Sequence, residues 1–300
     1  MKGMHVKEEI RFFDAIVLER AVEMFPLAFS TYSMRLSIMP SISFLGTGSG
    51  FPESDRFFSS SLLRIGDHHL LIDAGEPCVH SLRDRGTLIR EIDTVLITHG
   101  HVDHIGGIPA LLQGAMLLER TKALQICLPE EMIVPLRAWI SALYLTEQGL
   151  GFPLHWRAWS DGLPVELFGG EISVTPFSNQ HLALSYLSLP GADPERPCES
   201  FSLDVTTPDF RAIFSGDVAK GGDLSKLVAK KADVLISELS HLSPEALAAA
   251  LATAELQSLC LVHLSEDYSG EPESLRNKMQ GLLPGDVDVF VPQDGEVLDF

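Results

Sequence analysis

Short apolar runs alternate with longer segments of helical periodicity along most of the chain, starting at Ser41. The apolar runs predict β-strands at 41–45, 61–65, 69–72, 94–98, 124–128, 172–176, 211–214, 234–236, 259–262 and 287–291. Segments in which apolar residues recur at helical spacing predict helices at about 105–119, 130–146, 222–231, 243–255 and 272–282. The aromatic-rich segment 129–159 is expected to combine packed helix with edge structure. Strands that alternate with helices indicate a layered α/β fold in one domain.

Residues 1–38 follow a different pattern. Apolar residues recur at helical spacing between Ile10 and Met24, which predicts a short amphipathic helix. Charged residues such as Arg11 and Arg20 interrupt this stretch, so it lacks the apolar core of a secretory signal. We therefore treat residues 1–38 as an N-terminal extension of unknown role, or as an over-long start, and residues 39–300 as the main domain.

Acidic residues outnumber basic ones, with 41 Asp plus Glu against 22 Lys plus Arg and a formal net charge of −19. Proteins that hold nucleic acid along a broad basic surface have the opposite balance, and anionic membranes repel an acidic chain. The composition therefore excludes general binding of polyanions and predicts no membrane partner. It leaves room for a small site in which metal ions offset the charge locally. The four cysteines are far apart, which favours reduced thiols, and the expected location is cytoplasmic.

The clearest chemical signal is the run Val95-Leu-Ile-Thr-His-Gly-His-Val-Asp-His-Ile-Gly-Gly-Ile-Pro109. An apolar strand ends at Thr98, and a dense group of potential metal ligands follows at once. These are His99, His101, Asp103 and His104. Imidazole and carboxylate are ligands that Zn²⁺ and similar divalent ions prefer, and packing alone does not explain such a density on one loop. The run therefore predicts a metal site.

Three more segments repeat this order of an apolar strand followed by a polar ligand. They end on His181, Asp217 and His263. A lone histidine is more often structural than a ligand, so His181 or His263 alone would carry little weight. In layered α/β folds, however, ligands gather at the carboxyl ends of strands. We therefore expect these residues to share one cleft with the cluster at 99–104.

The His-x-His-x-Asp-His run at 99–104 resembles the most specific motif of the metallo-β-lactamase superfamily of binuclear hydrolases. Other motifs of that superfamily are matched by Leu70-Leu-Ile-Asp-Ala-Gly75, Ser215-Gly-Asp217 and His263. The segments that look like its ribonuclease Z branch are Phe44–Pro52, Ser59–Ser61 and Leu261–Tyr268. Phosphodiesterases that act on small cyclic phosphates share much of this pattern. The resemblance implies an α/β, four-layer αβ/βα sandwich of the metallo-β-lactamase type, with 39–300 as the hydrolase domain.

The resemblance also implies the ligands of a binuclear centre. Metal 1 would be held by His99, His101 and His181, and metal 2 by Asp103, His104 and His263. Asp217 would bridge the two ions, which in such sites lie about 3.5–4 Å apart, and Asp73 would orient a ligand imidazole from the second shell of contacts. The implied cofactors are two divalent metal ions, zinc first, with manganese or iron as alternatives. Asp103 would also orient the attacking water or accept its proton.

The segment Glu238-Leu-Ser-His241-Leu-Ser243 resembles the place where ribonuclease Z and related phosphodiesterases keep a Glu–His pair. By this resemblance, His241 is the general acid that protonates the leaving alkoxide and Glu238 is its orienting partner. The alternative is a purely local role. In that case Ser240 and Ser243 cap a helix that starts near Pro244, and His241 only lines the loop.

Three features depart from ribonuclease Z. The stretch between His181 and Asp217 is short, whereas that family usually carries there a long arm that grips tRNA. Asp267 stands where the family tends to place an arginine, and Ser237 replaces a histidine that often precedes the glutamate. An acidic side chain repels phosphates. These departures favour a small phosphodiester or nucleotide-like substrate over RNA.

The sequence therefore predicts a metal-dependent hydrolase, above all a phosphodiesterase that resembles ribonuclease Z but lacks its tRNA-gripping arm. Hydrolysis of carboxyl esters, lactones or thioesters on the same metals is one alternative. A non-catalytic metal-binding protein is another. By analogy with related proteins, a homodimer is among the assemblies to expect.

Overall fold

The structure is a computed structural model that describes residues 39–51, 53–86 and 89–300. The extension 1–38 and its expected helix lie outside the described residues. One sheet consists of β1 (Ser41–Gly46), β2 (Ser60–Ile65), β3 (His68–Ile72), β4 (Thr94–Leu96), β5 (Leu124–Leu128), β6 (Leu154–Ala158) and β14 (Val297–Asp299). The other consists of β7 (Val165–Leu167), β8 (Ile172–Ser178), β9 (Phe201–Thr206), β10 (Arg211–Phe214), β11 (Ala232–Leu239), β12 (Leu256–Leu264) and β13 (Asp288–Phe290).

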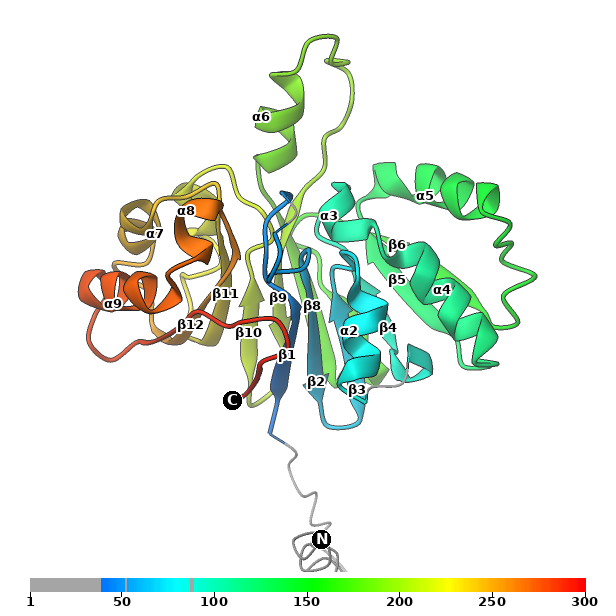
Figure 1. Ribbon diagram of the computed structural model, residues 1–300, viewed down its shortest axis with the longest axis horizontal. Coiled ribbons are helices and arrows are strands. Elements are labelled where there is room, and N and C mark those ends of the chain that lie inside the picture. The colour runs from blue at the N-terminus through cyan, green and yellow to red at the C-terminus, as the bar shows by residue number, and fades with distance from the viewer. Residues whose placement is uncertain (1–38, 52, 87–88) are drawn as a thin grey trace, which may run out of the picture. The chain divides into compact units, whose positions relative to one another are not determined.

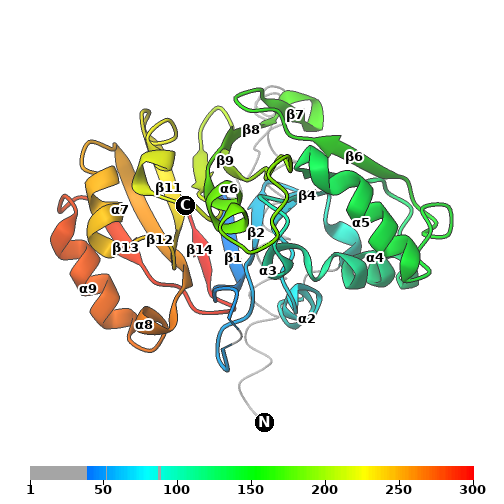
Figure 2. The same cartoon turned by 90° about the horizontal axis from the view of Figure 1, so that it is seen from above.

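Helices cover the outer face of each sheet (Figures 1 and 2). On the first sheet they are α2 (Cys78–Asp84), α3 (Val102–Ile105), α4 (Ile108–Leu117) and α5 (Glu130–Ala142). On the second they are α7 (Pro244–Ala250), α8 (Glu266–Ser269) and α9 (Pro272–Leu282). The strand orders are β14-β1-β2-β3-β4-β5-β6 and β13-β12-β11-β10-β9-β8-β7. The expected four-layer αβ/βα sandwich is confirmed.

The strands are apolar on both faces, and this explains why each sheet needs cover on both sides. In β3, Leu71 belongs to the core beneath the helices of the first sheet, whereas Leu70 and Ile72 belong to the core between the sheets. In β4, Val95 belongs to the core beneath the helices, and Leu96 belongs to the core between the sheets. Successive side chains of a strand point to opposite faces. A continuous apolar run is therefore stable only between two apolar layers.

Most of the expected elements are present, and one is not. The helix expected at 105–119 divides into α3 and α4 around Gly106 and Gly107. The prediction of a helix at 222–231 is wrong, since this segment holds only a short 3₁₀ turn at Gly221–Leu224 followed by turns. Glycines disfavour a helix start there, and the periodicity of this segment reflects Leu224 and Leu227, which are buried against the second sheet.

The parallel strands of the two sheets end at a common edge. Strands β3 to β6 run parallel in the first sheet, and β10 to β13 run parallel in the second. At this edge Gly48, just after β1, forms a bridge with Leu264 at the end of β12. The loops that follow these strands are therefore brought together, and they carry the polar residues identified in the sequence.

A short segment projects from the same edge (Figure 1). It consists of α6 (His181–Leu187) and the chain that follows, and we call residues 181–199 the α6 arm. The backbone N–H of Asn179 donates to the carbonyl of Ser200 at 2.9 Å, so the two ends of the arm meet at its base. The first part of the short stretch between His181 and Asp217, the α6 arm, thus forms a compact projection, and the rest forms β9 and β10.

None of the helices in the described part of the chain has the length and apolar composition required to cross a membrane. The cytoplasmic location stays a prediction.

The core between the sheets generates a stability prediction. Leu203 of β9 is fully buried there, and Leu203→Ala should lower the free energy of unfolding by about 2–5 kcal/mol because it removes buried methyl groups and leaves a cavity. Urea denaturation measures this loss. As the control, Leu184→Ala changes a side chain that is 58% exposed and should shift stability by less than about 0.5 kcal/mol. Equal effects of the two changes would contradict the assigned core.

Candidate metal centre

Seven side chains meet at the edge where the strands end, and they fall into two groups that share one carboxylate. The first group is His99, His101, His181 and Asp217, and the second is Asp103, His104, Asp217 and His263. In each group the donor atoms all lie within 4.8 Å of one another. All the ligand positions expected from the sequence are therefore brought into one cluster.

The first group gathers three imidazole nitrogens and one carboxylate oxygen. His101 Nδ1 lies 3.1 Å from His99 Nε2 and 3.3 Å from His181 Nε2. Asp217 Oδ2 lies 3.8 Å from His99 Nε2 and 3.6 Å from His181 Nε2. These atoms come from the loop after β4, the first residue of α6 and the loop after β10, so both sheets contribute.

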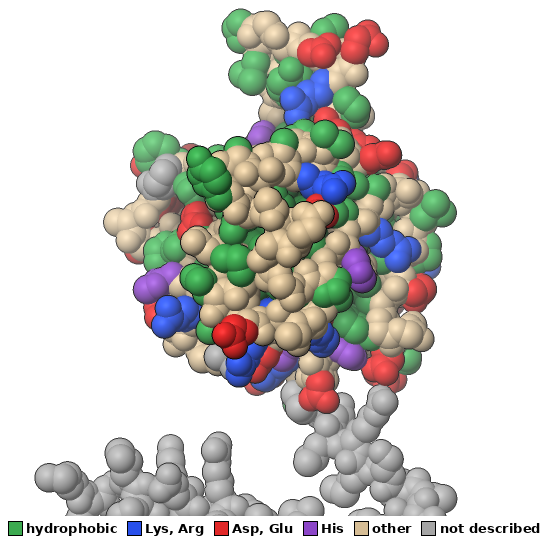
Figure 3. Space-filling view, turned by 90° about the vertical axis from the view of Figure 1, so that its right-hand side faces the viewer, with side chains coloured by type: hydrophobic (Ala, Val, Ile, Leu, Met, Phe, Trp, Pro, Cys, Tyr) green, Lys and Arg blue, Asp and Glu red, His purple; other side chains and the backbone are tan. Residues whose placement is uncertain are grey.

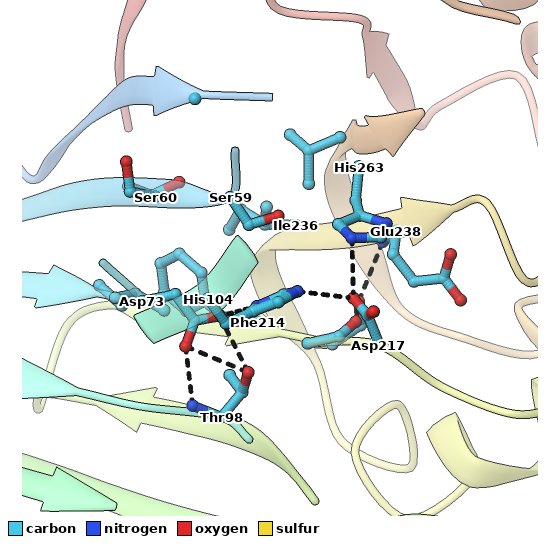
Figure 4. Close-up of a pocket in the computed structure, with 16 residues that line it drawn as sticks. Ser59, Ser60, Asp73, Thr98, His104, Phe214, Asp217, Ile236, Glu238 and His263 are labelled. Atoms are coloured by element: carbon cyan, nitrogen blue, oxygen red, sulfur yellow. Dashed lines mark hydrogen bonds and ion pairs between the residues drawn. The ribbon is translucent and has the colours of Figure 1, made fainter. Parts of the chain in front are cut away.

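The second group gathers two imidazole nitrogens and two carboxylate oxygens. Asp103 Oδ2 lies 3.4 Å from His104 Nε2 and 3.2 Å from His263 Nε2. Asp217 Oδ1 lies 3.4 Å and 3.5 Å from the same two nitrogens. Figure 4 shows the dashed lines from His104 and from His263 converging on the Asp217 carboxylate. The two oxygens of Asp217 therefore face different groups.

Two buried atoms of the second group have no hydrogen-bond partner, namely His104 Nε2 and Asp217 Oδ1. A buried polar atom without a partner is unfavourable, and a cation between the two would satisfy both. Although burial alone would raise the pKa of Asp217, the charges of His263 and His104 lower it well below its usual value. Asp217 is thus a carboxylate at neutral pH, and the two donor sets fit two divalent ions.

Hydrogen bonds outside the cluster orient two of the imidazoles, those of His104 and His99. His104 Nδ1 donates to Asp73 Oδ2 at 2.7 Å, and Asp73 also accepts from the backbone N–H of Thr98 at 2.8 Å. Thr98 Oγ1 lies 3.0 Å from His99 Nδ1. Each of these contacts engages Nδ1 and leaves Nε2 to point into the cluster. Outer contacts of this kind fix the orientation of metal-binding histidines.

Burial keeps the first group of imidazoles uncharged. It lowers the pKa of His99 well below its usual value and lowers that of His181 to about 4, even though Asp217 acts in the opposite direction. Both rings are therefore neutral at pH 7. A neutral imidazole has a free lone pair on one nitrogen, and this is the form that binds metals.

The turn that delivers Asp217 requires a glycine. Gly216 has a φ of +54°, and a Cβ at this position would lie 2.9 Å from the carbonyl oxygen of Phe201. Both the backbone conformation and the close approach exclude a larger residue. The Ser-Gly-Asp pattern is therefore explained by geometry at the end of β10.

Glu238 and His241 lie beside the cluster. Glu238 is buried at the end of β11, and its Oε2 accepts the backbone N–H groups of Ser240 at 2.6 Å and of His241 at 2.9 Å. His241 Nδ1 lies 3.5 Å from the same oxygen. The His241 ring stacks edge-on against His181, with centroids 4.6 Å apart, and is the more exposed of the two. Burial lowers the pKa of His241, but the hydrogen bond and charge of Glu238 outweigh this and raise it.

Ser240 has a contact that the sequence did not predict. Its Oγ lies 2.9 Å from His263 Nδ1 and 3.1 Å from His241 Nδ1, so it connects a residue of the cluster with the candidate acid. Of the two serines considered as helix caps, only Ser243 caps α7, by accepting from the backbone N–H of Ala246 at 3.2 Å. The position of Ser240 between Glu238 and His241 is the signal that could have identified it.

The loop after β1 closes one side of the site. A Cβ on Gly50 would lie 3.2 Å from Asp103 Oδ2, so the loop backbone lies directly against the cluster. Asp294 holds the loop by accepting the side-chain O–H of Thr47 at 2.7 Å and the backbone N–H of Phe57 at 2.5 Å. The Gly-Thr-Gly-Ser-Gly segment at 46–50 thus lies at the rim of the site. Asp294 was not identified from the sequence, since only the fold brings it close.

Two solved structures share this fold. The metallo-β-lactamase fold protein YhfI from Bacillus subtilis superposes with a TM-score of 0.68 at 19% identity and covers 87% of this chain and 100% of its own. The short form of human tRNase Z superposes with a TM-score of 0.64 at 23% identity and covers 86% of this chain and 98% of its own. At these identities the likeness establishes the fold alone.

Sequence comparison gives the family. Ribonuclease Z of Natronomonas pharaonis is 27% identical over 307 aligned positions, which cover 86% of this chain and 97% of that protein. The family model described as Anti-Pycsar protein Apyc1 matches residues 40–262, well over half of the chain. The predicted membership of the metallo-β-lactamase superfamily, in its ribonuclease Z-like branch, is thus confirmed. This chain belongs to the Anti-Pycsar protein Apyc1 family of that superfamily.

Proposed function

We propose that the protein is a metal-dependent phosphodiesterase with a binuclear centre. The observation that carries this proposal is the position of Asp217, whose two carboxylate oxygens each face a separate group of buried donor atoms. Two-metal hydrolases use this arrangement, in which two sets of donor atoms share one carboxylate. A single structural ion would leave one of the two sets without a function.

The donor atoms support a specific assignment of ligands. His99, His101 and His181 would hold the first ion, and Asp103, His104 and His263 the second. Asp217 would bridge them, and Asp73 would keep His104 in position. A mixture of imidazole and carboxylate suits zinc, and manganese or iron are the alternatives.

When bound, two divalent ions supply Lewis acidity toward the phosphoryl oxygens and toward the attacking water. Asp103 has a further task in the proposal. Only its Oδ2 faces His104 and His263, so Oδ1 is available to orient the attacking water and to accept its proton. The loop at Gly50 limits the space around this carboxylate.

His241 would act as the general acid. Its Nδ1 is engaged by Ser240 and Glu238, which leaves Nε2 as the nitrogen available to a leaving group. Glu238 raises the pKa of His241, so the ring keeps its proton to a higher pH than a free histidine would. Its position on the more exposed side of His181 gives it access to a substrate.

The charge distribution favours a small substrate. The net charge of −19 gives the chain no broad basic surface for a long RNA, and Asp267 of α8 is exposed where a cation would help to hold phosphate. Lys220 lies close to the cluster, with Nζ 2.8 Å from the side-chain oxygen of Gln180, the residue before His181. A small phosphodiester or nucleotide-like molecule is therefore the proposed substrate. A homodimer is the proposed assembly.

Metal binding should stabilise the folded protein. With Zn²⁺ or Mn²⁺ at about 100 times its Kd, the gain is about 2.7 kcal/mol for each ion bound, which corresponds to a rise in Tm of roughly 5–10 °C per ion for a domain of this size. Differential scanning fluorimetry after chelator treatment measures this, and metal analysis should find two ions per chain.

Asp217→Asn should abolish most of the rise, whereas Asp267→Asn on the exposed surface of α8 should keep it. One ion per chain, or equal shifts in both variants, would argue against the binuclear centre.

Removal of the proposed acid should affect substrates according to their leaving groups. His241→Ala should lower kcat about 10²- to 10⁴-fold for a diester with an alkoxide leaving group. The loss should be far smaller for p-nitrophenyl esters, because p-nitrophenolate leaves without a proton. Steady-state kinetics with both substrates test this, and Ser243→Ala serves as the control because it removes only the cap of α7. Equal losses on both substrates would show that His241 has no acid role.

A substrate panel tests the function itself. Bis-p-nitrophenyl phosphate, a cyclic nucleotide, a precursor tRNA and a thioester are compared under one metal condition. We expect hydrolysis of the first two, since both are small phosphodiesters. Cleavage of the tRNA alone would show that the short arm suffices for RNA, and thioester hydrolysis alone would favour the carbonyl chemistry. Loss of all activity, even with added Zn²⁺ or Mn²⁺, would favour a non-catalytic metal-binding protein.

A further inference from the structure

A cavity separate from the metal centre opens beside it, between α5 and the α6 arm. Its volume is about 390 Å³, which lies within the range of pockets that bind small organic molecules. His101 and Gly100 line it on the side of the centre. We propose that this cavity receives an uncharged, ring-sized organic group, the one that stays attached to phosphorus after hydrolysis. This inference rests on the proposed phosphodiesterase function.

The walls of the cavity are mainly apolar. Met132 of α5 forms one side, and the α6 arm contributes Leu182, Tyr186 and Leu189 on the other. Met132 reaches this position because residue 100 is a glycine, since a Cβ there would lie 2.6 Å from the Met132 sulfur. An apolar wall with one aromatic ring stabilises a ring or alkyl group through burial and stacking.

The charges on the cavity wall exclude a second phosphate group, in addition to the one that would bind at the metal centre. Arg196 Nε lies 3.3 Å from Glu131 Oε2, so the cation on the wall is already paired with a largely buried carboxylate. The same guanidinium lies over the Tyr186 ring, 5.4 Å from its centroid. A second anionic group would meet Glu131 without an unpaired cation to balance it. The cavity therefore suits a neutral group and does not suit the next phosphate of an RNA chain.

The wall formed by the arm is fixed to the body of the domain. The backbone N–H of Glu199 donates to Glu131 Oε1 at 2.8 Å, and the backbone N–H of Glu131 donates to Glu199 Oε2 at 3.1 Å. This reciprocal pair ties the end of the arm to the first turn of α5. Figure 3 shows how far the rest of the arm stands above the domain, with apolar and charged side chains on it. The cavity is therefore preformed at its base, which favours binding of a rigid group.

The position of His241 determines which side of the substrate enters the cavity. His241 does not line it. The His181 ring contacts the rings of both His241 and His101, with centroid distances of 4.6 Å and 5.0 Å. Since His101 lines the cavity and His241 does not, a leaving group next to His241 lies outside the cavity. The group in the cavity is the one that remains on the phosphate.

Ser185→Phe provides the test, because Ser185 lines the cavity from α6 and a phenyl group would fill it. Two diesters with the same leaving group are compared, bis-p-nitrophenyl phosphate and methyl p-nitrophenyl phosphate, which retain an aryl and a methyl group respectively. The variant should lower kcat/KM for the aryl diester at least about tenfold and change that for the methyl diester less than about twofold.

The matched control is Leu184→Phe, which adds the same ring to the neighbouring exposed position. Leu189→Trp fills the cavity from the turn that follows α6 and should reproduce the effect.

Binding of phenylphosphonate and methylphosphonate to the metal-loaded protein, measured by calorimetry, gives a readout without turnover. The wild-type protein should prefer the phenyl compound, and Ser185→Phe should remove this preference. An unchanged preference in both cavity variants would overturn the proposed role of the cavity. A preference that depends on Ser185, without hydrolysis of either diester, would support the cavity and refute the phosphodiesterase function.

Discussion

The buried carboxylate of Asp217 is the constraint on which the rest of the site depends. A carboxylate that is only 2% exposed loses most of its hydration, and this loss is unfavourable unless positive charge or hydrogen-bond donors surround it. Here imidazole nitrogens from both sheets lie 3.4–3.8 Å from its oxygens, and cations held among these donors would supply the positive charge. The two sheets must therefore pack in one register for this charge to be tolerated. The packing that stabilises the sandwich therefore also sets the geometry of the centre.

The same dependence extends outward through hydrogen bonds. Asp73, Thr98 and Ser240 come from three different segments, and each engages the Nδ1 atom of an imidazole in the cluster. Asp73 and Ser240 can orient His104 and His263 only because the strand ends meet, whereas Thr98 directly precedes His99 in the chain. Because each donor atom is oriented by the fold, the cluster is organised without rearrangement of the backbone. Such preorganisation is what a two-metal site requires of its protein.

That these side chains lie together could be predicted because the signals are local. The four candidate ligands at 99–104 lie within six residues of the chain, and His181, Asp217 and His263 each follow an apolar strand in the sequence. Asp294 could not be predicted in this way, since its contacts are with residues more than 230 positions away. The position of Ser240 between Glu238 and His241 is a local signal, but its contact with His263 comes from the fold. Strands β7, β9 and β14 were missed, and β7 and β14 are short edge strands. The false helix at 222–231 shows that burial of two leucines from a turn can imitate helical periodicity.

The closed base of the α6 arm has a consequence for how such a protein can change. Since Asn179 and Ser200 already join the ends of the arm, chain added between them would cost little closure entropy, about 0.6 kcal/mol for each doubling of loop length. Only His181, the first residue of the arm, belongs to the metal cluster. The outer part of the arm can therefore be lengthened, shortened or exchanged while the ligands stay in place.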